Sequence, residues 1–134
     1  LTMGNYLALT GIIAGESLTA KQYLAVKLST SADRQVLAIT NANAERPVGI
    51  LQNDPASGEA ADVAVTGVCK AIYGGTVTRG DKLGCNNTGQ LITDVEVIAQ
   101  TGVDLHHIAI ALESGSLNDV RQVYCFAPQI VGLE

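Results

Sequence analysis

Residues 47–94 read PVGILQNDPASGEAADVAVTGVCKAIYGGTVTRGDKLGCNNTGQLITD, and this stretch decides the fold class. It contains short apolar runs, such as Pro47–Leu51 and Ala61–Tyr73, separated by clusters of Asn, Asp, Gly and Pro. These residue types favour turns because they tolerate or impose the backbone angles that turns require. The stretch therefore predicts short β-strands joined by turns. It contains no catalytic constellation.

The same rhythm extends to both sides of this stretch. Apolar residues alternate with others around Leu24–Leu28, at 108–112 and in Val120–Phe126, a strand that Pro128 is expected to end. A change of phase after Gly67 predicts a bulge or sharp bend. With about eight to ten short strands and frequent turns, the sequence predicts an all-β fold, either a small β-barrel or a β-sandwich.

One face of each expected strand should point into the core, and aromatic residues are too few to dominate that core. The expected core residues are Leu24, Val26, Leu28, Ile50, Val63, Val65, Ile108, Ile110 and Leu112.

A length of 134 residues suits one domain. We expect a single β domain over residues 23–134, preceded by an N-terminal arm or edge strand at 1–22, where Gly4, Gly11 and Gly15 interrupt any helix. Residues 94–104 are expected to form a loop or a short strand, since their β-branched residues weaken a helix.

Composition restricts the possible partners. The net charge of −5 and the scattered basic residues argue against nucleic-acid binding, which needs clustered Lys and Arg. No apolar run approaches the length of a membrane span, so no membrane partner is expected. Only 16% of the residues are charged while 47% are hydrophobic, which favours a surface covered by a protein partner.

The three cysteines, Cys69, Cys85 and Cys125, are widely spaced and odd in number. They form no C-x-x-C pair of the kind used in zinc or redox sites. Their apolar contexts, and the absence of a visible secretory signal, predict buried unpaired thiols in a protein made in the cytoplasm.

Other motifs have structural interpretations. His106 and His107 are adjacent in an expected strand, so they should point to opposite faces and not chelate one metal. Arg79–Asp81 forms an RGD tripeptide that fits a turn, and Asp54 and Glu59 lie in a solvated turn. We therefore predict no catalytic residues, no cofactor, no metal site and no enzymatic activity. A small β-barrel enzyme would need a pocket of convergent polar groups.

The order of the motifs carries a resemblance to a known family. The motifs are A-G-E-S-L-T-A at 14–20, P-V-G-I-L at 47–51, V-A-V-T-G-V at 63–68, R-G-D-K-L at 79–83, N-T-G-Q-L at 87–91 and I-A-I-A-L-E at 108–113. This pattern resembles the small capsid cement, or decoration, proteins of tailed bacteriophages.

The resemblance implies a compact β-barrel-like domain that is not an enzyme. It implies a structural virion protein that is made in the host cytoplasm and binds the outer surface of the capsid, where it bridges neighbouring subunits of the major capsid protein. It also implies self-association, most often as a homotrimer. A repeated bridge of this kind stabilises the assembled shell because it binds only that state.

Two questions stay open at this stage. The apolar arm residues Tyr6, Leu7, Leu9, Ile12 and Ile13 are the expected capsid contacts, through addition of a strand to an exposed capsid edge. Alternatively, the arm is the first strand of the domain itself. The alternative function is a carbohydrate- or host-binding domain on the virion surface, which would need exposed aromatic residues for stacking on sugar rings.

Overall fold

The computed structural model describes residues 5–42, 44–93 and 105–131, and the expected loop or strand at 94–104 lies outside these ranges. The described residues form 10 β-strands and no helix, so they include no helix that could cross a membrane. The strands are β1 (Asn5–Ala8), β2 (Ile13–Ala14), β3 (Ala25–Leu28), β4 (Gln35–Ala38), β5 (Pro47–Leu51), β6 (Val63–Ile72), β7 (Lys82–Cys85), β8 (Leu91–Ile92), β9 (Leu105–Ala111) and β10 (Val120–Val131).

The strands form one sheet, in the order β2-β4-β3-β5-β6-β10-β9-β7-β8, and β1 also pairs with β6. All neighbouring pairs are antiparallel except β2 and β4, which are parallel. The prediction of an all-β fold is therefore confirmed. The barrel alternative is wrong because the sheet is open, ending at β2 and β8, and a sandwich-like domain fits the arrangement.

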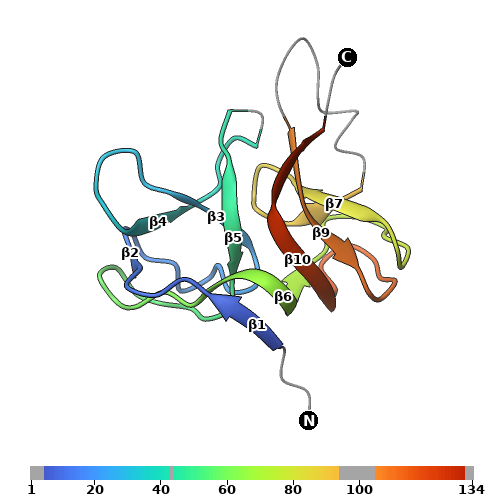
Figure 1. Cartoon of the computed structure of the whole chain (residues 1–134), viewed down its shortest axis with the longest axis horizontal. Helices are drawn as coiled ribbons and strands as arrows, with labels where there is room; N and C mark the ends of the chain where they lie inside the picture. The colour runs from blue at the N-terminus through green and yellow to red at the C-terminus, as the bar shows by residue number, and fades with distance from the viewer. Residues whose placement is uncertain (1–4, 43, 94–104, 132–134) are drawn as a thin grey trace.

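β6 is the central strand, which pairs with three other strands, β1, β5 and β10 (Figure 1). Its Ala64 pairs with Ile50 of β5 and also with Ala8 of β1, while Gly67 pairs with both β10 and β1. Since a strand has only two edges, β1 occupies one edge of β6, and β5 and β10 share the other.

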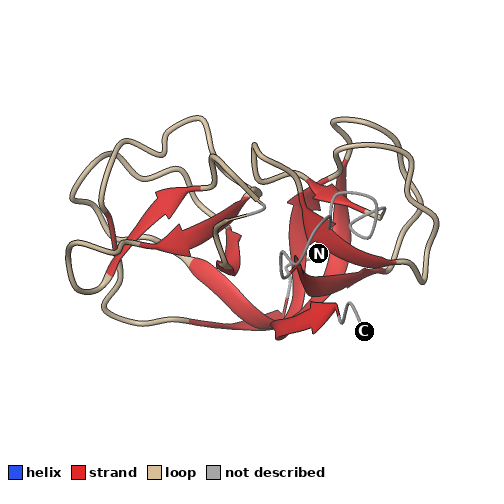
Figure 2. Ribbon diagram, turned by 90° about the horizontal axis from the view of Figure 1, so that it is seen from above, coloured by secondary structure: helices blue, strands red, loops and turns tan. Residues whose placement is uncertain are grey.

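The shared edge divides the sheet into two wings (Figures 1 and 2). We call β2–β5 the N-terminal wing and β7–β10 the C-terminal wing. Figure 2 shows the strands of the two wings on either side of the molecule. The wings are also in direct contact, because the backbone N–H of Ala25 donates to the carbonyl oxygen of Gly89. Two hydrophobic clusters form the core. The smaller one, with Leu18, Val26 and Val36, lies in the N-terminal wing, whereas the larger one joins Tyr73 and Leu83 to residues of the N-terminal wing such as Ile50.

The predicted core is correct in part. Leu24, Val26, Ile50, Val63 and Ile108 are buried.

Val65 and Ile110 are only half-buried, and Leu28 and Leu112 are 46% and 45% exposed. Leu28 is exposed because it ends β3 beyond a register shift in the pairing with β5.

In β9 the structure buries the alanine face, which the predicted core left out, in addition to Ile108. Ala109 and Ala111 are buried, whereas Ile110 and Leu112 point outward. Small side chains are favoured on the inner face because the core opposite already contains Tyr73, which is fully buried. Its hydroxyl donates to the carbonyl oxygen of Glu113 at 2.6 Å.

Two backbone expectations also need correction. Pro128 does not end β10, which continues to Val131 past a register shift between Cys125 and Gln129. A bulge is where a strand tolerates proline. Gly67 brings no change of phase either, since Cys69 and Tyr73 are buried with the same parity as Val63.

Gly67 is instead a point of close approach. Its φ is +115°, and a Cβ atom there would lie 2.4 Å from the carbonyl oxygen of Asn5 in β1. Only glycine allows β1 to pair with β6 at this distance.

Candidate interaction surfaces

The five predicted contact residues do not form one exposed patch. Leu9 and Ile12 pack against the smaller cluster, and Ile13 is half-buried in β2, where it pairs with Gln35. Tyr6 is half-buried, and its hydroxyl donates to Asp62 Oδ2 at 2.7 Å.

Burial of Tyr6, reinforced by the hydrogen bond to Asp62, raises the pKa of the phenol to about 12. The Tyr6 hydroxyl is thus held as a neutral donor at physiological pH, and this contact ties β1 to the segment before β6. Leu7 is the exception among the five residues, because 67% of it is exposed.

β1 presents an open edge on the side away from β6. The backbone N–H of Leu9 donates to the carbonyl oxygen of Val63, so the alternating pattern directs the main-chain groups of Tyr6 and Ala8 away from β6. The pairing register shifts between Leu7 and Ala8, and the extra residue of this shift lies in β6. The main-chain groups of β1 therefore keep alternating between the two sides of the strand. An edge of this kind can template pairing with another strand.

The edge of β1 lacks the usual protection against pairing. Natural edge strands are commonly blocked by charged residues, proline or bulges in the edge strand itself. Residues 5–15 contain no charged residue and no proline. The open edge is therefore chemically suited to strand addition.

A second surface covers the outside of β6, β9 and β10, and we call it the outer face. Across these strands Ile110 pairs with Tyr124, and Tyr124 pairs with Val68. Leu112, Val120 and Tyr124 are 45%, 40% and 42% exposed. The rings of Tyr124 and Phe126 lie 6.2 Å apart. Gln122 and Lys70 pair on the same face between Val120 and Tyr124, so the apolar residues form two groups. Exposed apolar groups of this kind are typical of surfaces that partners cover.

The sequence analysis missed the outer face. It assigned Ile110 and Leu112 to the core, and it considered the aromatic residues only as too few to dominate that core. A signal was present in Val120–Phe126, where both alternating sets contain apolar residues. A strand with two apolar faces is expected to be covered on both of them. In the single chain only the inner face of this strand is covered.

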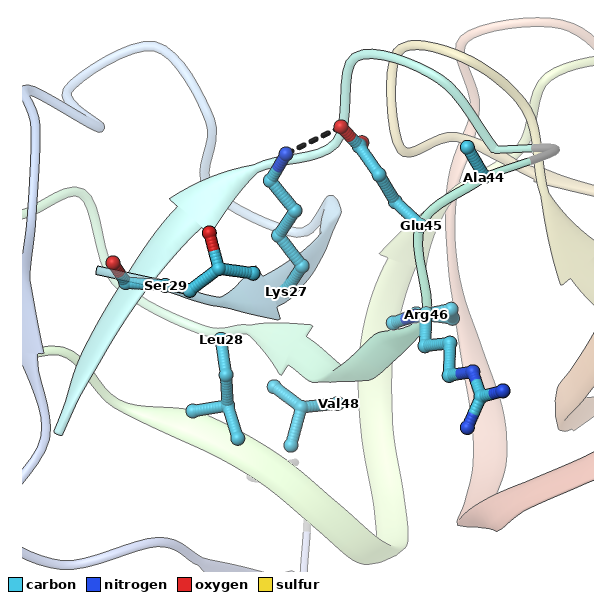
Figure 3. Close-up of a pocket in the computed structure, with 9 residues that line it drawn as sticks. Lys27, Leu28, Ser29, Ala44, Glu45, Arg46 and Val48 are labelled. Carbon is cyan, nitrogen blue, oxygen red and sulfur yellow. Dashed lines mark hydrogen bonds and ion pairs between the residues drawn. The ribbon is translucent and has the colours of Figure 1, made fainter. Parts of the chain in front are cut away.

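A groove lies between the end of β3 and the start of β5 (Figure 3). Its volume is about 600 Å³, and its lining residues are Lys27, Leu28, Ser29, Thr30, Ala44, Glu45, Arg46, Pro47 and Val48. Leu28 and Val48 give it an apolar wall, while Lys27 and Glu45 form an ion pair at its rim.

Glu45 organises one side of this groove. Its carboxylate accepts hydrogen bonds from the backbone N–H groups of Thr40 and Asn41, from the Thr40 hydroxyl and from Lys27. Burial alone would raise the pKa of Glu45, but these donors outweigh it and lower the pKa to about 2. The carboxylate is thus engaged within the protein, which is typical of a structural group and not of a general base.

The other candidate groups are also engaged in local structure. Arg79–Asp81 forms a turn in which Asp81 accepts from the backbone N–H of Thr78. His106 and His107 lie in β9, opposite β10. Within the ranges that the structure describes, no three His, Cys, Asp or Glu side chains are grouped so that they could hold a metal ion.

Comparison by sequence gives no match, neither to a family model nor to a curated protein. Comparison by structure does give one. The fold is similar to the crystal structure of the N base of head fiber gp8.5 in bacteriophage phi29, with a TM-score of 0.58. The match covers 97% of this chain and 100% of that chain at 11% sequence identity. At this identity the likeness establishes the shared fold alone.

Proposed function

We propose that this protein is a structural component of a phage virion, bound to the outer surface of the capsid, where it bridges neighbouring major capsid subunits without any catalytic role. The observation that carries the proposal is the fold likeness to a phage head fiber base over nearly the whole of both chains. The motif order of the sequence, which resembles capsid cement proteins, supports the same conclusion independently.

The open edge of β1 supports a specific mode of attachment. An extended segment of a capsid subunit could pair with the outward main-chain groups of Tyr6 and Ala8, and Leu7 would supply an apolar anchor. In this mode β1 keeps its pairing with β6, so little conformational freedom is lost on binding. The predicted capsid contacts thereby narrow to the edge around Leu7.

Self-association, as a homotrimer, is the second part of the proposal. The outer face is apolar at Leu112, Val120 and Tyr124, and burial between copies would remove this surface from water. A trimer would engage several capsid subunits at once, which raises the effective concentration of each further contact.

Co-sedimentation with capsid shells, assembled from the major capsid protein of the same phage, tests the attachment. The Leu7→Asp variant should bind at least about tenfold more weakly, because a charge would be buried at the junction. The Ala8→Pro variant should also bind weakly, since it removes an outward N–H and spares the inward ladder. The matched control is Leu117→Asp, at a leucine that is 58% exposed in the turn before β10. It should bind like the wild type.

The outcomes of this experiment separate the parts of the proposal. If folded wild-type protein does not bind the shells at all, the capsid role is wrong. If all three variants bind like the wild type, capsid attachment stands but the edge of β1 is not the contact. Analytical ultracentrifugation of the wild type tests the trimer, and a monomer at micromolar concentration would refute it.

One observation favours the alternative function. Tyr124 is 42% exposed and its ring is close to that of Phe126, so the outer face offers an aromatic platform for a sugar ring. A glycan array would reveal such an activity. Binding that is lost in Tyr124→Ala and kept in Leu117→Asp would establish it.

A further inference from the structure

Two of the three cysteines meet in the core between β6 and β10. Cys69 lies opposite Val123, and Cys125 lies opposite Gly67, so both thiols are on the same face and diagonal to each other. The two Sγ atoms are 3.5 Å apart, and both residues are almost completely buried, at 0% and 2% exposure.

The thiols form a directed chain of hydrogen bonds. Cys69 Sγ donates to Cys125 Sγ, and Cys125 Sγ donates to the carbonyl oxygen of Gly67 at 3.2 Å. Sulfur atoms in contact on adjacent strands are close to the arrangement of a disulfide, which needs an S–S distance of about 2 Å. Because diagonal positions on paired strands lie farther apart than directly opposite ones, closure of the bond also requires a small shift of β6 and β10.

We propose that Cys69 and Cys125 are a redox-active dithiol, which is reduced as synthesised and closes to an intramolecular disulfide when the folded protein meets hydrogen peroxide. The inference rests on the geometry of this pair and is independent of the proposed capsid role. A small oxidant is required because neither thiol is accessible to a bulky one.

The direction of the hydrogen bond assigns the order of the two steps. Donation from Cys69 stabilises the thiolate of Cys125, which lowers the pKa of Cys125, whereas the same bond and burial raise the pKa of Cys69. Cys125 is therefore the attacking sulfur, and Cys69 is the resolving one.

In the first step Cys125 Sγ attacks one peroxide oxygen and the O–O bond breaks. The Cys125 thiol proton leaves with the other oxygen as water, and Cys125 becomes a sulfenic acid. In the second step Cys69 Sγ attacks Cys125 Sγ and forms the S–S bond. The hydroxyl group leaves with the Cys69 proton as a second water. The two thiols thus lose two electrons and two protons, and one peroxide is reduced to two waters.

Cys85 provides an internal control. It lies in β7, separated from β10 by β9, and burial raises its pKa to about 12. A buried thiol with a raised pKa reacts slowly with peroxide, so Cys85 should stay reduced.

The experiment uses the full-length protein, reduced and folded, with and without a modest excess of hydrogen peroxide. Thiols are then counted in denaturant, and a non-reduced digest is analysed by mass spectrometry. We expect the count to fall from three to one, with a linked peptide pair containing Cys69 and Cys125. The melting temperature should rise by about 5–10 °C, because the bond closes a long loop of the unfolded chain, and dithiothreitol should reverse the rise.

The variants sharpen this test. Cys85→Ser should form the same bridge and count zero thiols after oxidation, while Cys69→Ser and Cys125→Ser should form no intramolecular bridge. A wild-type count that stays at three, or a bridge that includes Cys85, would overturn the proposal. So would a bridge that forms only in denaturant.

Discussion

The two wings of the sheet reach order by different means. The N-terminal wing is built from strands of two to five residues. Side chains stabilise the loops between them by hydrogen bonds, as Glu45 does when it accepts from the backbone N–H groups of Thr40 and Asn41. The C-terminal wing contains the long strands β9 and β10, of 7 and 12 residues, and it supplies most residues of the larger apolar cluster, including Tyr73 and Leu83. Apolar burial therefore dominates the stability of the C-terminal wing, whereas charge-assisted hydrogen bonds contribute more to the stability of the N-terminal wing.

The largest effect is expected from Tyr73→Ala in the C-terminal wing. Tyr73 is fully buried, packs closely against Gly115, and donates its hydroxyl to Glu113. Removing the ring should lower the free energy of unfolding by about 3–5 kcal/mol, through lost burial and a residual cavity. Urea unfolding followed by circular dichroism measures the loss.

Two reference variants locate the cause. Tyr73→Phe keeps the ring and removes only the hydroxyl bond, so it should cost about 1 kcal/mol. Leu18→Ala removes a fully buried side chain from the N-terminal wing, and we expect a smaller loss than for Tyr73→Ala. If Leu18→Ala costs more, the larger cluster is not the dominant source of stability.

A smaller effect is expected at the joint between the wings. Gly67→Ala places a Cβ against the backbone of β1 at a φ of +115°, so it should cost about 3 kcal/mol through strain and displacement of β1. Hydrogen exchange should report lost protection at Leu7 and Leu9, where the main chain faces β6.

Gly58→Ala is the matched control, since Gly58 has a φ of +86° and nothing within 4 Å of the added carbon. It carries the strain of the backbone angle without the clash, so it should cost less and leave the exchange in β1 unchanged. Equal effects of the two substitutions would show that the close approach of β1 is unimportant.

The sequence was sufficient for the fold class but not for the choice of faces. Val26 and Val63 were placed correctly because each alternates with more polar neighbours. The segment Ile108–Leu112 misled the analysis because both of its faces are apolar, and the larger residues were assumed to be inside. The alanines Ala109 and Ala111 are buried instead, in the same cluster as Tyr73, a residue far away in the chain.

Long-range contacts explain the rest of what was missed. The hydrogen bond from Tyr6 to Asp62 joins residues 56 positions apart, and nothing in either local sequence indicates it. The same is true of the contact between Cys69 and Cys125. The uncharged character of the N-terminal segment was visible in the sequence, but its pairing with β6 was one of two open alternatives.

An effect smaller than that of Gly67→Ala is expected in the N-terminal wing, and it depends on pH. In Glu45→Gln the amide replaces a carboxylate that accepts hydrogen bonds from Lys27, Thr40 and Asn41. The substitution should cost about 1.5 kcal/mol at pH 7, the low end for bonds to a charged group, because the site is partly exposed.

The sign of the pH dependence follows from the lowered pKa. Glu45 titrates at about 2 in the folded protein and at 4.5 without its partners, so the unfolded chain binds more protons between these values. The stabilisation is therefore complete above about pH 4.5 and is lost as the pH falls towards 2. Unfolding measured from pH 6 to pH 2 should show a shallower decline for Glu45→Gln than for the wild type. Should Glu45→Gln keep the wild-type slope instead, Glu45 does not provide the acid sensitivity of the N-terminal wing, and the contrast between the wings must have another origin.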